Sequence, residues 1–159
     1  IDPPKPMHPE IGLLVNDKAD SESRELAADE IYQVFKREFL ENHSPLRLIG
    51  YETGKVEGEA DLVSCTASIE YAGEARTIEG RGNGPINAFV HALESAGLKD
   101  FTLTDYRQHS IGSGSATESA AYVRLNTSIG RVAYGCGIDS SIERSGLLAL
   151  VSAFNRTRA

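Results

Sequence analysis

Two glycine-rich turns are the features of this sequence best suited to chemistry. Gly80–Pro85 reads Gly-Arg-Gly-Asn-Gly-Pro and precedes a helical pattern, and Gly135–Gly137 precedes a second one. Such a turn leaves backbone N–H groups free at the positive end of a helix, where they suit a carboxylate or a phosphate. Glycine also permits a positive φ and close approach of a ligand to the backbone. An ordinary strand-to-helix turn that binds nothing fits the same residues, so both interpretations stay open.

Neither turn matches a nucleotide-binding motif, and no catalytic set accompanies them. The dinucleotide fingerprint needs G-x-G-x-x-G within a strand–helix–strand unit, and a P-loop needs Gly-Lys-Ser/Thr where Pro85-Ile86 stands here. There is no G-x-S-x-G sequence. The histidines are isolated from one another and from the cysteines, without metal-site spacing, at positions His8, His43, His91 and His109. We therefore expect no catalytic residue, metal or cofactor in this chain.

Strands and a helix are predicted around the first turn. Residues 63–71 alternate between apolar and polar, which is typical of a half-buried strand. Apolar residues at helical spacing follow Pro85, and Gly97 stands where a helix cap belongs. Upstream, residues 26–40 form an amphipathic pattern, with a break at Pro45. Two further strands are predicted at 46–51 and 75–79.

The same order recurs in the second half of the chain. Strands are predicted at 101–106, 119–127 and 131–139, before a final helix with capping-box spacing between Ser140 and Glu143. One helix covers only one sheet face, so packing two such units together buries what each leaves exposed. The sequence predicts an α+β domain of two pseudo-twofold-related units of antiparallel strands, each closed by one helix. The repeat units are 46–98 and 99–159, and the duplication builds either a symmetric site or only a stable core.

The N-terminal segment, the net charge, the hydropathy and the cysteines limit the classes of protein to which this chain can belong. Residues 1–25 contain four prolines and are typical of a linker with little structure, ahead of a linker helix at 26–45. Because the first residue is Ile1 and not methionine, we expect a piece of a longer polypeptide. A net charge of −7 without a basic cluster argues against nucleic acid, and no apolar run reaches the about 18 residues of a membrane span. Cys65 and Cys136 lack CxxC spacing and are expected to be buried free thiols of a cytoplasmic protein.

Residues 80–93, GRGNGPINAFVHAL, are followed by Asp105-Tyr106 and by Gly-Cys-Gly-Ile at 135–138. Together these segments resemble the regulatory domain of the 2-isopropylmalate synthase family. The resemblance covers roughly residues 26–159, including the closing segment 151–156. The G-x-G-N-G-P run before an alanine-rich helix is fairly specific to this family and its close relatives, which include citramalate synthases that sense isoleucine.

The resemblance implies a domain that dimerises and binds L-leucine at the dimer interface, for feedback inhibition of the condensation of acetyl-CoA with 3-methyl-2-oxobutanoate. In the family a metal-dependent catalytic barrel performs that reaction. Nothing in this chain matches the barrel, so residues 1–25 are expected to lead to it, and a divalent metal is expected only there. The effector-binding residues carried over by position are Gly82, Asn83, Gly84, Ile86, Leu103, Tyr106, Ser110 and Ile138.

Leucine has the chemistry that such a site requires. Its carboxylate suits the N–H groups of the loop, and burying its isobutyl group in an apolar wall is worth about 1.5–3 kcal/mol. The ammonium group needs carbonyls or an acid, and the sequence identifies no partner for it. Family members often carry an acid in the loop that reads Gly114-Ser115-Ala116 here. The alternatives are an isoleucine-sensing domain of a related synthase and a purely structural dimerisation module.

Overall fold

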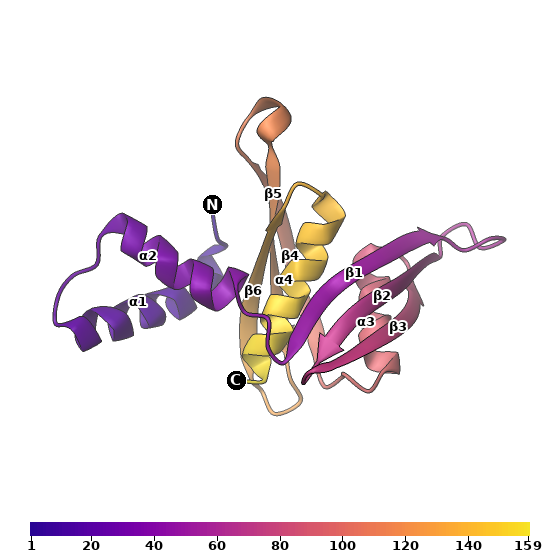
Figure 1. Cartoon of the computed structure of the whole chain (residues 1–159), viewed down its shortest axis with the longest axis horizontal. Helices are drawn as coiled ribbons and strands as arrows, with labels where there is room; N and C mark the ends of the chain where they lie inside the picture. Colours follow the sequence, from indigo (N-terminus) through magenta and orange to yellow (C-terminus); the bar gives the residue numbers. More distant parts are fainter.

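The computed structural model describes residues 1–159 and shows two units of antiparallel strands, each followed by one helix (Figure 1). The first unit has the sheet order β1-β2-β3, and the second has β4-β5-β6. The predicted α+β fold of two units is confirmed. The elements of the first unit are β1 (Leu46–Lys55), β2 (Val63–Tyr71), β3 (Glu74–Gly82) and α3 (Pro85–Ser95). Those of the second are β4 (Thr102–Ile111), β5 (Glu118–Asn126), β6 (Val132–Asp139) and α4 (Ile142–Thr157), with a short 3-10 turn at Gly114–Ala116.

Local sequence explains how the first sheet forms. In β2, Cys65, Ala67 and Ile69 are buried, whereas the alternate residues face away from the core. Ala72 and Gly73 both have positive φ, at 50° and 85°, and connect β2 to β3 in a two-residue hairpin. This is the backbone shape that matches the twist of the paired strands.

The two units repeat one another in detail. The pairing of β1 with β2 shifts between Leu48 and Gly50, and that of β4 with β5 shifts between Leu103 and Asp105. Both irregularities therefore lie at equivalent positions, 55 residues apart. A core of 21 buried residues lies between the sheets and the helices α3 and α4, with Phe89 and Phe154 among its largest side chains.

The N-terminal segment contains more structure than the sequence predicts. Residues 1–25 were expected to have little, but a 3-10 turn (Lys5–Met7) leads into helix α1 (His8–Glu22). Pro9 lies in the first turn of α1, where the missing N–H is not needed. Met7 is buried against the second sheet, and Ile11 and Leu14 pack beside it, which supplies the tertiary contact that holds the helix.

Helix α2 (Ala28–Phe35) continues as a π-helical turn, Lys36–Leu40, in place of the single helix predicted. Its residues Phe35 and Phe39 stack at 4.9 Å and complete a second apolar cluster on the face of the second sheet that lies away from α4. Arg156 of α4 joins these parts, because its guanidinium donates to Glu10 at 2.5 Å and to Glu38 at 3.0 Å. The second sheet is thus covered on both faces.

Candidate functional site

The first glycine-rich turn is partly strand and not wholly loop. Gly80 and Gly82 belong to β3 and lie directly under α3. A Cβ added at Gly80 would lie 2.5 Å from the carbonyl oxygen of Ala88, and one added at Gly82 would lie 2.7 Å from the nitrogen of Ala88. These glycines therefore let the backbone of a helix pack directly on a strand.

The second turn serves the same purpose. A Cβ at Gly135 would lie 2.7 Å from the Cα of Ala153, and one at Gly137 would lie 2.6 Å from the nitrogen of Ala149. None of the glycines at 80, 82, 84, 135 and 137 has a positive φ, so neither turn uses the left-handed backbone that glycine permits. What the repeated G-x-G motif provides is close packing of helix on sheet.

Gly84 differs from its neighbours in the motif. It is the N-cap of α3 with an extended φ of −173°, and a Cβ added to it would meet no atom within 4 Å. Its carbonyl accepts from the N–H of Ala88 at 2.9 Å, and the N–H of the exposed Asn83 donates to the Asn87 side chain at 3.1 Å. Gly84 therefore borders open space in front of the helix, at the positive end of its dipole.

Two of the expected effector residues meet in a hollow beside the start of α3. Ile86 and Tyr106 line this hollow of about 320 Å³, which also has Pro85, Ile142 and Glu143 in its wall, whereas Asn83 and Gly84 precede Pro85 and are not part of the wall. Gly146 makes the approach possible, because a Cβ there would lie 2.6 Å from Ile86 Cδ1 and 2.8 Å from the Tyr106 hydroxyl. Burial raises the pKa of Tyr106, and its hydroxyl is protonated at neutral pH even without this shift. The first turns of α3 and α4 thus face one hollow.

Hydrogen bonds fix strand β4 against the start of α4 beside the hollow. The side-chain amide of Gln108 donates to the Ile142 carbonyl at 2.9 Å and to the hydroxyls of Ser145 and Ser119 at 3.1 and 2.9 Å. Because side chains alternate along a strand, Tyr106 and Gln108 share the face that meets α4. The position of Tyr106 over the helix is therefore held by its own strand.

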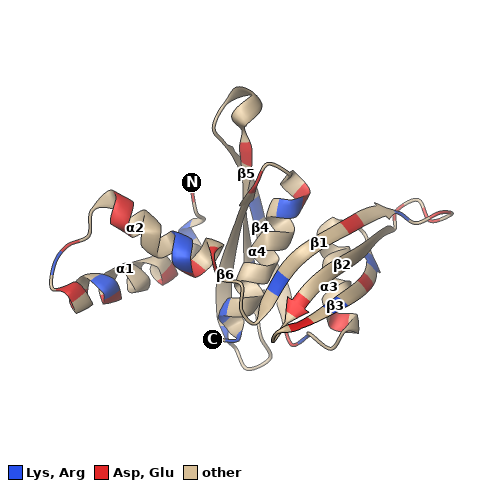
Figure 2. Cartoon of the chain, in the orientation of Figure 1, with Lys and Arg blue, Asp and Glu red and all other residues tan.

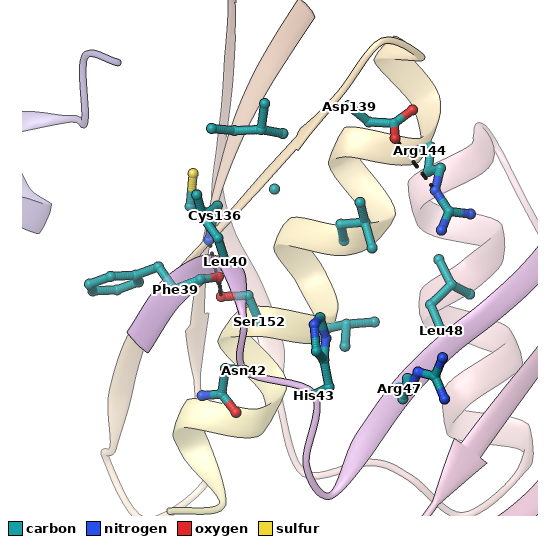
Figure 3. Close-up of a pocket in the computed structure, with 14 residues that line it drawn as sticks. Phe39, Leu40, Asn42, His43, Arg47, Leu48, Cys136, Asp139, Arg144 and Ser152 are labelled. Atoms are coloured by element: carbon teal, nitrogen blue, oxygen red, sulfur yellow. Dashed lines mark hydrogen bonds and ion pairs between the residues drawn. The ribbon is translucent and has the colours of Figure 1, made fainter. Parts of the chain in front are cut away.

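The structure does not bring all the expected residues to this hollow. Gly82 is buried under α3, Leu103 packs against the main core, and Ser110 is exposed further along β4, opposite Ser119. Ile138 lines a separate hollow of about 350 Å³ between β6, α4 and residues 39–48 (Figure 3). Within one chain, Ile86 and Tyr106 are together and Ile138 is apart from them.

Sequence reasoning missed Ile142, Glu143 and Gly146. The predicted capping box of Ser140 with Glu143 is wrong, since Ser141 caps α4 by accepting from the N–H of Arg144 at 3.2 Å. The side chain of Glu143 instead accepts a hydrogen bond from the Thr53 hydroxyl of β1. The internal repeat could have indicated these residues, because the start of α4 is equivalent to the start of α3, where Ile86 was expected to bind the effector.

Other candidate groups lie outside this hollow. Cys65 and Cys136 are buried and unpaired, as predicted, and burial raises the pKa of their thiols to about 11 and about 12. No group of three His, Cys, Asp or Glu side chains is placed to hold a metal ion. None of the helices has the length and apolar character to cross a membrane. Basic and acidic residues are interspersed along the elements (Figure 2).

Comparison with known families identifies the arrangement. The model of the LeuA allosteric (dimerisation) domain matches residues 25–158. The chain belongs to this family. The LeuA domain contains both repeat units and α2, and the match begins after α1.

Relatives of this LeuA domain occur in much longer proteins. The 2-isopropylmalate synthase of Clostridium acetobutylicum is 35% identical over 98% of the chain and 28% of that protein. Those of Acetoanaerobium sticklandii and Corynebacterium efficiens are 34% and 36% identical over 96% of the chain, and 27% and 26% of their own length. The chain therefore spans about a quarter of the length of the curated relatives it matches.

Proposed function

We propose that this LeuA domain is the regulatory part of a 2-isopropylmalate synthase. It binds L-leucine between two copies of itself and thereby inhibits the condensation of acetyl-CoA with 3-methyl-2-oxobutanoate. A catalytic barrel of the same polypeptide performs the reaction, and this chain supplies no catalytic residue. The family match and the synthase relatives support the proposal.

The observation that carries the proposal is the hollow between the starts of α3 and α4. Ile86, Tyr106 and Ile142 offer an apolar wall for a branched side chain, and the first turn of α3 offers N–H groups for a carboxylate. Its volume of about 320 Å³ falls at the lower end of the range for small-molecule sites.

The hollow is open at the surface of a single chain. Ile142 is 66% exposed and Tyr106 is 37% exposed, although both are large apolar side chains at its rim. A second copy laid over this rim would remove them from water and enclose the ligand. Closed symmetric dimers are the commonest assembly of soluble proteins, and they place the same surface patch on both partners. An effector site shared between two copies therefore fits the exposure of these residues.

Calorimetric titration of the chain with leucine, isoleucine and valine tests the proposal. We expect leucine to bind most tightly, by a modest margin, because a shifted or missing methyl in an apolar pocket changes affinity by about 1–3 kcal/mol. Tighter binding of isoleucine would indicate the regulatory domain of a related synthase. Absence of binding by all three would refute the proposal and leave a structural dimerisation module.

The substitution Gly84→Val tests the location of the site. The fold tolerates a side chain here, since φ is extended and no atom lies within 4 Å, but the new group would occupy the space in front of α3. We expect leucine binding to be lost while the melting temperature stays near that of the parent. Gly54→Val in β1 is the matched control, because its added Cβ also meets nothing within 4 Å. A Gly84→Val chain that binds leucine normally would show that the effector lies elsewhere.

A further inference from the structure

Glu143 is the one acidic side chain in the wall of the hollow, and it forms no ion pair. The neighbouring Arg144 pairs instead with Asp139, at 3.6 Å, on the side of the second hollow. We propose that Glu143 binds the ammonium group of the effector and restricts the site to ligands with a free α-amino group. This inference rests on the proposed binding of an amino acid in this hollow.

The carboxylate of Glu143 is already held in position. The hydroxyl of Thr53 donates to Oε1 of Glu143, which fixes the side chain between β1 and the first turn of α4. A carboxylate has two oxygens and about four acceptor sites, so one bond from Thr53 leaves most of its capacity for a ligand. An ammonium group brings three hydrogen-bond donors and a positive charge. The carboxylate of Glu143 has no such partner in the free chain.

A role in capping α4 or in stabilising its dipole does not by itself account for this placement. An acid in the first turn of a helix is stabilised by the helix dipole wherever it points, and one in a capping box turns back to the backbone N–H of the cap. Here Ser141 caps α4 with its own hydroxyl, and Glu143 is turned toward β1 and the hollow. Glu143 therefore lies in the wall of a hollow that no basic residue lines, with its carboxylate bonded to Thr53 and not to the helix cap.

The arrangement matches the two ends of an α-amino acid. The first turn of α3 offers N–H groups and a positive dipole end to the carboxylate. Glu143 stands in the wall contributed by α4 and offers negative charge to the ammonium group. Ile86, Tyr106 and Ile142 remain to contact the side chain of the bound amino acid. The ligand class is accordingly an amino acid with a branched apolar side chain, and the same acid without its amino group should bind only weakly.

Two ligands and two variants test the assignment. Leucine and 4-methylpentanoate, which has the same carbon skeleton without the amino group, are titrated into the parent chain and into Glu143→Gln. Glutamine keeps the size and the acceptor for Thr53 but removes the charge. We expect leucine affinity to fall roughly 10- to 100-fold, the range for a hydrogen bond to a charged group. The weak affinity for 4-methylpentanoate should stay unchanged or rise.

Glu79→Gln is the matched control, because it makes the same change of charge on the exposed side of β3, outside the hollow. It should bind leucine as the parent does. If the parent binds no amino acid, the proposed function itself fails, whatever Glu143 does. If the parent binds leucine and Glu143→Gln binds it equally well, the function stands and this assignment is overturned. An equal loss of both ligands would also overturn it, since Glu143 would then only shape the hollow.

Discussion

The substitution Gly80→Ala tests whether the G-x-G motif packs a helix on a strand. A Cβ at this position would lie 2.5 Å from the Ala88 carbonyl oxygen and 2.8 Å from the Ala92 Cα, and both are backbone atoms that cannot rotate away. Ordinary contact distances are about 3.5–4.0 Å, so α3 would have to move by about 1 Å. Overpacking of this kind typically costs about 1–3 kcal/mol, and the rigid neighbours favour the upper end.

Thermal unfolding gives the readout. In a domain of this size each kcal/mol lowers the melting temperature by about 2–4 °C, so Gly80→Ala should lose roughly 6–12 °C. Gly84→Ala is the control within the same motif, because its Cβ meets nothing within 4 Å and φ is extended. It should stay within about 0.5 kcal/mol of the parent. Equal melting temperatures for the two variants would refute the packing role and restore the interpretation of the whole motif as a binding loop.

The chain is expected to be a homodimer without ligand, and light scattering that gives a monomer at micromolar concentration would contradict this. Asn155→Ala should destabilise the chain by about 2–4 kcal/mol in urea unfolding, because the buried amide bonds to both the N–H and the carbonyl of Leu46 and to the Asn42 carbonyl. At pH 8 the thiols of Cys65 and Cys136 should resist a thiol reagent until denaturant is added, since burial raises their pKa to about 11 and about 12 and keeps them protonated. Rapid labelling of the native chain would show that the strands open.

Much of the fold is predictable because its periodicity is strong. Strand β2 occupies residues 63–71 as predicted, since its alternation of apolar and polar residues matches its burial. Strands β1, β3 and β4 extend beyond the predicted segments, because most residues at their ends pair in the sheet without burying apolar side chains, Ile111 at the end of β4 being the exception. Helix α1 was missed, because prolines obscured the spacing of Met7, Ile11 and Leu14, which is helical and is satisfied only by the distant second sheet.

The candidate site was harder to predict for a physical reason. Glycine carries no signal that distinguishes a residue packed under a helix, such as Gly80, from one bordering open space, such as Gly84. Whether a glycine is covered depends on where α3 packs, and this packing is part of the tertiary structure and cannot be read from the local sequence. The spacing between Ser140 and Glu143 favours a capping box, whereas the Thr53 hydroxyl of β1 holds the Glu143 carboxylate away from the cap.

The packing glycines also bear on how a regulatory domain of this kind responds to its effector. Both helices rest on their sheets through backbone-to-backbone contacts, and Gln108 ties β4 to the start of α4. The positions of the two helices that border the hollow are therefore set largely by backbone contacts, which cannot adjust by rotating a side chain. A ligand entering it meets a site that is already formed, so little binding free energy is lost in ordering the protein. A ligand changes activity only through different affinities for two states, and a rigid hollow offers only one. We therefore expect the two states to differ in how the second copy covers the exposed rim at Tyr106 and Ile142, and not in the shape of the hollow within one chain.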